Sequence, residues 1–170
     1  MSAEAAPPVN RAPVIAVIGE NDPTPEIIAL AEAVGEQIAL AGAVLVCGGM
    51  GGVMEAACRG AHRKGGVTIG ILPGTRQDDA NRYVTYALPT GLGHARNVIV
   101  ARAAQAVIAV GGKYGTLSEI AFAKIEGTAV IGLRTWELRR DGFDDPAIQP
   151  AADPKDAVHL ALEAARRRPN

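Results

Sequence analysis

Short apolar runs alternate with helical patterns along most of this chain. Val14–Gly19 is a continuous β-branched run, which is typical of a strand buried on both faces. From Glu26 to Ala41 the apolar residues instead recur at helical spacing, and this predicts a helix with one face in the core. Thr24 is placed to cap that helix, Pro25 to occupy its first turn and Gly42 to end it.

The same unit of strand and helix repeats toward the C-terminus. The further predicted strands are Val44–Cys47, Val67–Leu72, a short one near Tyr83–Ala87, Ala106–Val110 and, as the last, Ala129–Leu133. The further predicted helices are Val53–Lys64, His94–Ala103, Thr116–Glu126 and, capped by Asp153, Pro154–Arg167. Because helices separate the strands, the crossovers should be right-handed and the sheet parallel. We therefore predict a Rossmann-like, doubly wound α/β fold with helices on both faces and ligands beyond the carboxyl ends of the strands.

Length and composition are consistent with this fold. A chain of 170 residues suits one domain, since domains commonly run to roughly 100–200 residues. We expect residues 1–12 to form a disordered arm and residues 13–170 a single ligand-binding domain. The chain is 48% hydrophobic but only 4% aromatic, so its core consists of small aliphatic side chains that let helices pack closely on a sheet.

Charge and cysteine content argue against several classes of function. The net charge is −1, from 17 basic and 18 acidic residues, with no basic stripe for nucleic acid or for a membrane surface. The apolar run Ala103–Val110 is far shorter than the roughly 20 residues of a membrane span, and residues 1–12 lack the pattern of a signal peptide. Two cysteines without a CxxC motif fit a reducing compartment. We expect a cytoplasmic protein with no nucleic-acid or membrane partner.

Two glycine-rich loops follow predicted strands and lead directly into predicted helices. They read GGMGGVMEAA at Gly48–Ala57 and GGKYGTLSE at Gly111–Glu119. Such a loop leaves backbone N–H groups unpaired near one point, and glycine lets a ligand approach them closely. The positive end of the helix dipole favours phosphate there. Thr116 is placed to cap the second helix or to donate its hydroxyl to an anion. Neither loop is a Walker or GxGxxG sequence.

These loops carry a recognisable signature. The chain resembles the Lonely Guy-like proteins, the SLOG superfamily long mislabelled as lysine decarboxylases, whose signature pairs GGxxGxM with PGGxGTxxE. Here the motifs read GGMGGVM at Gly48–Met54 and GGKYGTLSE at Gly111–Glu119. The resemblance covers Pro13 to about Leu133, in matching order and spacing. It implies the same fold and a ligand that bears phosphate.

The resemblance also implies a catalytic pair. Enzymes of this family hydrolyse the N-glycosidic bond of nucleoside 5′-monophosphates with an arginine and a glutamate, and by position these are Arg96 and Glu119. A carboxylate can stabilise an oxocarbenium ion or orient water, and the arginine can hold phosphate or position the carboxylate. One hypothesis is therefore that the chain is a nucleoside 5′-monophosphate phosphoribohydrolase.

The chain departs from the enzymes at three positions. Gly111 replaces the proline of PGG, Lys113 its second glycine, and Asn97 the lysine that usually follows the arginine. The sequence GHARN followed by VGGxxGTLSE resembles that of a shorter branch of the superfamily, which includes molybdenum cofactor carrier proteins. This branch implies a homo-oligomer, a dimer or tetramer, that binds a pterin with a terminal phosphate and serves molybdoenzymes.

We therefore favour a protein that binds or carries molybdenum cofactor without turnover, over the hydrolase, with a nucleotide sensor as a third hypothesis. The ligand is then molybdenum cofactor or, in the alternatives, a nucleoside monophosphate. The predicted binding residues are Gly48, Gly49, Met50, Gly51, Gly52, Arg96, Asn97, Gly111, Gly112, Lys113, Tyr114, Gly115, Thr116 and Glu119.

Several other polar or sulfur-bearing residues have simpler interpretations. His94, before a helix, is expected to be a cap or a surface residue. Cys47 is expected to be a small core residue, and Cys58 a structural residue with no visible partner. We expect no bound metal, because no His, Cys, Asp and Glu cluster has metal-ligand spacing. Glu119 is expected in the first turn of its helix, where the dipole favours a carboxylate.

Overall fold

The computed structural model describes residues 11–144 and 146–167. The strands of the main sheet are β1 (Val14–Gly19), β2 (Val44–Cys47), β3 (Thr68–Leu72), β4 (Tyr86–Pro89), β5 (Ala106–Val110), β6 (Ala129–Leu133) and β9 (Gln149–Pro150). The helices are α1 (Pro25–Leu40), α2 (Val53–Arg63), α3 (Asn97–Arg102), α4 (Tyr114–Ile125) and α5 (Pro154–Arg167). All but two residues of the predicted disordered arm lie outside the described residues.

The sheet confirms the predicted doubly wound topology. Its seven strands lie in the order β4-β3-β2-β1-β5-β6-β9, and every neighbouring pair is parallel. The direction of winding reverses between β1 and β5, which pair along Ile15–Gly19 and Ala106–Val110. In such sheets the crevice at the reversal, beyond the carboxyl ends of the strands, is where ligands bind.

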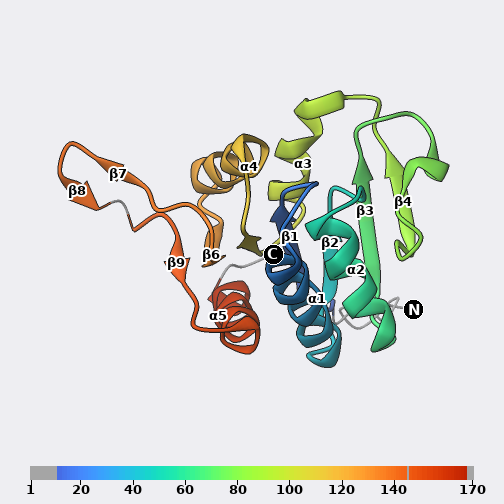
Figure 1. Ribbon diagram of the computed structural model, residues 1–170, viewed down its shortest axis with the longest axis horizontal. Helices are drawn as coiled ribbons and strands as arrows, with labels where there is room; N and C mark the ends of the chain where they lie inside the picture. Colours follow the sequence, from blue (N-terminus) through green and yellow to red (C-terminus); the bar gives the residue numbers. More distant parts are fainter. Residues whose placement is uncertain (1–10, 145, 168–170) are drawn as a thin grey trace, which may run out of the picture.

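Helices cover both faces of the sheet, as predicted (Figure 1). On one face α1, α2 and α5 pack over a core that includes Ile15, Val17 and Ile108; on the other, α3 and α4 pack over Ala16, Ile18 and Val107. Consecutive residues of a strand thus point into different cores, and this explains why the strands read as unbroken apolar runs.

The predicted ends of two helices are confirmed. The side chain of Thr24 accepts a hydrogen bond from the N–H of Ile27 at the start of α1, and Pro25 is its first residue. Gly42, with φ of +70°, follows the end of that helix. Asp153 accepts from the N–H of Asp156 at 2.9 Å at the start of α5.

Several predicted elements differ from the structure. The strand expected near Tyr83–Ala87 is β4, which begins three residues later and ends two residues later. The helix expected over His94–Ala103 is a 3₁₀ turn, Gly93–Arg96, followed by α3. Ala129–Leu133 is not the last strand, because β9 joins its edge and a small hairpin pairs β7 (Arg139–Arg140) with β8 (Phe143–Asp144). Strands of two residues are too short for an alternating pattern, so only the fold itself reveals them.

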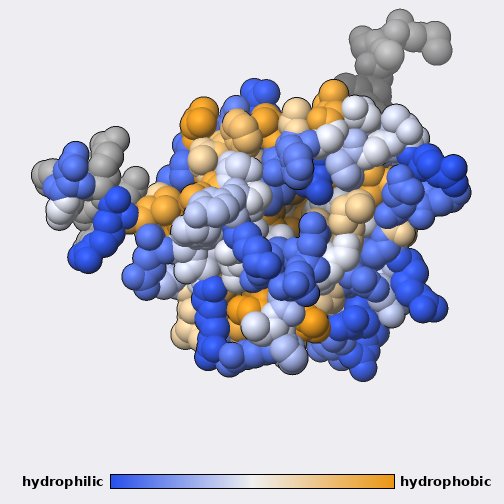
Figure 2. Space-filling view, turned by 45° about the horizontal axis from the view of Figure 1, so that its top comes forward, coloured by the Kyte–Doolittle hydropathy of each residue, from blue (hydrophilic) through white to orange (hydrophobic). Residues whose placement is uncertain are grey.

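The surface is mainly polar on the face that Figure 2 presents, where apolar residues form separate small patches. The hairpin of β7 and β8 projects from the body of the domain (Figure 1). No helix of the described residues is long and apolar enough to cross a membrane.

Candidate functional site: a cleft between two glycine loops

A cleft of about 460 Å³ lies at the carboxyl ends of β1, β2 and β5. The loop after β1 lines it with Glu20, Asn21 and Asp22. The first glycine loop follows β2 and the second follows β5, and both contribute residues. Since β1 lies between β2 and β5, the sheet brings three loops from distant parts of the sequence to one place.

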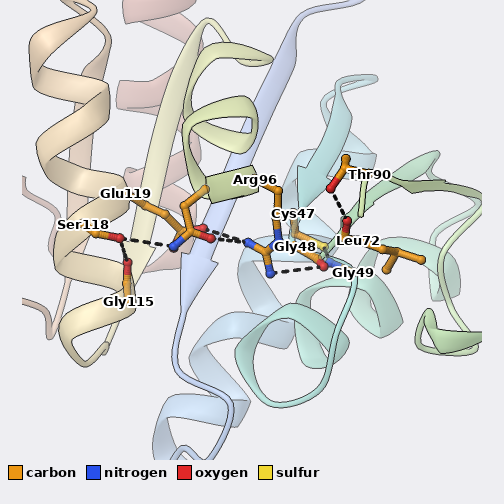
Figure 3. Close-up of polar contacts among 10 residues, drawn as sticks. Cys47, Gly48, Gly49, Leu72, Thr90, Arg96, Gly115, Ser118 and Glu119 are labelled. Carbon is orange, nitrogen blue, oxygen red and sulfur yellow. Dashed lines mark hydrogen bonds and ion pairs between the residues drawn. The ribbon is translucent and has the colours of Figure 1, made fainter. Parts of the chain in front are cut away.

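Arg96 joins the two sides of this cleft. Its Nη1 donates to Asn97 Oδ1 at 2.7 Å and to Glu119 Oε1 at 3.3 Å, while Nη2 lies 3.5 Å from the carbonyl oxygen of Gly48. Figure 3 shows the guanidinium between Glu119 and the first glycine loop. Its Nε is buried with no hydrogen-bond partner in the structure. The predicted arginine and glutamate are thus in direct contact.

Asn97 extends this network to the second loop. Its Nδ2 donates to Ser118 Oγ at 3.2 Å. Ser118 donates in turn to the carbonyl oxygen of Gly115 at 2.6 Å (Figure 3). The residue at the position of the family's lysine therefore connects Arg96 to the backbone of the second glycine loop.

Glu119 is buried, with a residue exposure of 6%. Burial raises the pKa of its carboxyl group to about 7, against the opposing effect of the Arg96 charge. The prediction that it lies in the first turn of its helix was wrong, because α4 begins at Tyr114 and Glu119 falls in the second turn. Its pKa therefore reflects a dry site and one cation rather than a helix terminus.

The first glycine loop packs closely on the arginine. A Cβ added to Gly48 would lie 2.4 Å from Nη2 of Arg96 and 2.7 Å from Sδ of Met54, so a side chain at this position would displace the ends of these two side chains. Helix α2 begins after Gly52 without a side-chain cap. The N–H of its first residue, Val53, donates to the carbonyl oxygen of Glu20 at 3.0 Å. The start of the helix lies after the carboxyl end of β2, where the positive end of the helix dipole favours an anion.

The second loop also begins a helix without a cap. Thr116 was predicted as a possible cap, but the N-cap of α4 is Lys113, and Thr116 lies inside the helix with 2% of its surface exposed. Its hydroxyl has no hydrogen-bond partner in the structure. Gly112 has φ of +120° and a Cβ there would lie 2.6 Å from Thr116. A buried hydroxyl without a partner, on the wall of a cleft, is suited to completion by a ligand.

Half of the predicted binding residues line the cleft. These are Met50, Arg96, Asn97, Lys113, Gly115, Thr116 and Glu119. The other predicted loop residues, Gly48, Gly49, Gly51, Gly52, Gly111, Gly112 and Tyr114, lie beside it rather than on its wall, and Tyr114 is 81% exposed. His94, expected to be a cap or a surface residue, is exposed and also lines the cleft, while Leu92 is the N-cap of its turn.

Sequence reasoning missed the loop after β1. Glu20 accepts a hydrogen bond from the N–H of Gly112 at 3.3 Å and pairs with Lys113 Nζ at 3.5 Å. The available signal was its place directly after the first predicted strand, at the same edge of the sheet as the glycine loops.

The two cysteines lie together below the first glycine loop. Their sulfur atoms are 3.5 Å apart, and Cys47 Sγ also accepts from the N–H of Gly49 at 3.3 Å. The prediction that Cys58 has no partner was therefore wrong, because the cysteines of β2 and α2 face each other. The hydrogen bond with Cys58 lowers the pKa of Cys47, and the same contact raises the pKa of Cys58.

A larger hollow of about 810 Å³ lies elsewhere, along the segments on either side of the β7–β8 hairpin, and its wall includes Arg134, Trp136 and Ile148. It contains none of the predicted binding residues. Among the described residues, no group of three or more His, Cys, Asp and Glu side chains is arranged to hold a metal ion.

The cleft brings together groups that are suited to bind an anion and one that is suited to exchange a proton. The two helix starts and Arg96 supply N–H donors and positive charge. Glu119, with a pKa near neutrality, is able to take up or release a proton at physiological pH.

Comparison with known proteins finds relatives and solved structures that resemble this chain over most of its length. The molybdenum cofactor binding protein of Rippkaea orientalis is 36% identical, with a TM-score of 0.82 over 91% of this chain and 98% of that chain. The Moco carrier protein of Chlamydomonas reinhardtii is 33% identical, with a TM-score of 0.81 over 93% of this chain and 100% of that chain. An uncharacterized protein of Archaeoglobus fulgidus is 48% identical over 120 residues, 71% of this chain and 79% of the relative.

The predicted resemblance to the SLOG superfamily, in the branch with the molybdenum cofactor carriers, is thus confirmed. A model of the SLOG cluster4 family matches residues 12–161, which include every element that builds the cleft. The chain belongs to the SLOG cluster4 family.

Proposed function

We propose that this protein binds molybdenum cofactor in the cleft between its glycine loops, by the terminal phosphate, and holds it without turnover. Two solved structures of proteins named for binding or carrying this cofactor resemble this protein. The match covers more than nine-tenths of this chain and of each neighbour. In this proposal Arg96 and the uncapped starts of α2 and α4 hold the phosphate.

One observation carries the proposal most directly. Two helices without side-chain caps begin beside a single cleft, and a buried arginine with an unpaired Nε lies between them. The other two described helices of more than two turns, α1 and α5, are capped by Thr24 and Asp153. Among these four helices, the two starts without a side-chain cap are the two beside the cleft, where a phosphate can accept N–H groups that no side chain caps.

A second candidate is the nucleoside 5′-monophosphate phosphoribohydrolase. The contact of 3.3 Å between Arg96 and Glu119, with the pKa of Glu119 near 7, favours it. A carboxyl group of this kind is able to protonate a leaving base at neutral pH. The substitutions at the second loop, Gly111 and Lys113, separate this chain from the hydrolase signature, so we rank the carrier first.

A turnover assay separates the two functions. The purified protein is incubated with a panel of nucleoside 5′-monophosphates and followed for free base, beside Glu119→Gln and the matched control Glu163→Gln on α5, a half-buried residue outside the lining of the cleft. We expect no base from any of the three, with thermal stabilisation by phosphate-bearing ligands retained. Release by the wild type and Glu163→Gln that disappears in Glu119→Gln would establish the hydrolase and refute the carrier.

A further inference from the structure

The second glycine loop already holds an anion, and that anion belongs to the protein. Glu20 Oε1 accepts from the N–H of Gly112 at 3.3 Å, and Oε2 lies 3.5 Å from Nζ of Lys113. A Cβ added to Gly111 would lie 3.1 Å from Oε1. The carboxylate thus occupies the position beside the donors of this loop where a bound phosphate would lie.

We infer that Glu20 is an internal competitor for the second glycine loop, and that a bound phosphate displaces its carboxylate from Gly112 and Lys113. This inference rests on the proposed binding of a phosphate-bearing ligand and names a residue that sets the affinity of that site. A carboxylate and a phosphate cannot share these donors, because two anions a few ångströms apart repel strongly at a partly buried site.

The topology explains why this residue makes the contact. Gly19 pairs with Val110 in the parallel register of β1 and β5, so the residues that follow, Glu20 and Gly111, leave the sheet side by side. The main chain of Glu20 is held as well, because its carbonyl oxygen accepts from the N–H of Val53 at the start of α2. The side chain is therefore free to leave the second loop while the backbone remains fixed.

Two observations show that the second loop retains unused capacity for a ligand. The hydroxyl of Thr116 is buried on the cleft wall without a hydrogen-bond partner, even with Glu20 in place. Lys113 keeps 67% of its side chain exposed, so its ammonium group can turn from the carboxylate to a phosphate. A dianionic phosphate provides more charge and more acceptors than the single carboxylate that it replaces.

The test compares phosphate affinity in matched variants. Inorganic phosphate is titrated into the wild type, Glu20→Gln and Glu137→Gln by calorimetry at pH 7.5. Glu137→Gln is the control, because Glu137 is an exposed residue outside the lining of the cleft and this variant loses the same charge by the same substitution. We expect Glu20→Gln to tighten binding by about tenfold and Glu137→Gln to change it by less than about twofold, since exposed charges are screened.

Unchanged or weaker phosphate binding by Glu20→Gln would overturn the inference. A complete lack of phosphate binding by the wild type and by Glu20→Gln would overturn it as well. Equal tightening by both variants would show a general charge effect and would overturn it too. If Glu20→Gln fails to fold, the amide resonance of Gly112 in the ¹⁵N-labelled wild type gives the answer. We expect it to shift with the same Kd as the calorimetric binding, and a resonance that is unmoved at saturating phosphate contradicts displacement.

The proposed function and this inference can fail separately. A protein that retains no molybdenum cofactor, yet binds phosphate more tightly after Glu20→Gln, would refute the carrier and support the role of Glu20. A protein that retains the cofactor, with unchanged phosphate affinity in that variant, would support the carrier and refute the role of Glu20.

Discussion

The pair of Arg96 and Glu119 places two charges in a dry environment, with 10% and 8% of their side chains exposed. Removing charged groups from water is costly unless each finds partners. Arg96 is held by Asn97 and Gly48 as well as by Glu119, whereas burial outweighs the arginine's effect on the carboxyl group and raises its pKa to about 7. The site is therefore less stable when Glu119 is ionised than when it carries a proton.

This imbalance predicts a pH-dependent stability. The unfolded carboxyl titrates near 4.5 and the folded one near 7, so the folded state binds more protons between these values and the free energy of unfolding falls as pH rises through them. We expect the free energy of unfolding of Glu119→Gln not to fall in this way. Relative to the wild type, it should therefore increase by up to about 3 kcal/mol as pH rises from 4.5 to 8. Urea unfolding across that range measures it, with Glu137→Gln at an exposed residue as control. Parallel curves for the wild type and Glu119→Gln would contradict the assignment.

At the scale of single residues, the sequence predicted which residues belong to the site better than it predicted the contacts of each residue. Arg96 and Glu119 were predicted as partners from the family signature, and they are in contact. The interpretations of Thr116 as a cap and Cys58 as a residue without a partner were wrong, because each depends on where a helix begins or which element lies opposite. Local sequence carries little of that information.

At the scale of elements, the two glycine loops serve different purposes. The first lets Arg96 approach the backbone, since a side chain at Gly48 would collide with its guanidinium. The second gives φ of +120° at Gly112, beside the buried Thr116. Both loops also lead into helices without side-chain caps. Their geometry therefore shapes the cleft as well as the turn from strand to helix.

Alanine substitutions in the first loop test this distinction. We expect Gly48→Ala to displace Arg96 and to weaken inorganic phosphate binding by about tenfold or more, because a charge-assisted contact is lost. Gly51→Ala is the matched control, because a Cβ there meets nothing within 4 Å. Calorimetry gives the affinities and circular dichroism the fold. Similar affinities for the two variants would show that the close approach to Arg96 does not matter for binding.

Several element boundaries followed from the sequence where an apolar run or a cap marked them. The strands Val14–Gly19, Val44–Cys47, Ala106–Val110 and Ala129–Leu133 and the helix Pro154–Arg167 have the predicted bounds. The strand β4 was misplaced because exposed residues alternate with half-buried ones at this edge of the sheet. The strands of the small hairpin have no pattern that distinguishes them from a loop.

At the scale of the whole molecule, strand order determines the composition of the cleft. The sequence predicted alternating strands and helices and the edge where ligands bind, but it gave no order of the strands across the sheet. Because β1 lies between β2 and β5, Glu20 reaches the second glycine loop. This contact is tertiary, and it explains why the predicted site contained both glycine loops but not the acidic residue between them.

The most direct test of the central claim is retention of molybdenum cofactor by the purified protein. Cofactor released from a molybdoenzyme is added to the wild type, Arg96→Met and Arg102→Met, the last a control at an exposed arginine of α3 whose side chain is 62% exposed. Molybdenum and pterin that co-elute with each protein in gel filtration are then measured. The account predicts stoichiometric, chemically intact cofactor on the wild type and Arg102→Met, with at least about tenfold less on Arg96→Met. No retention by the wild type, or equal retention by Arg96→Met, would contradict it.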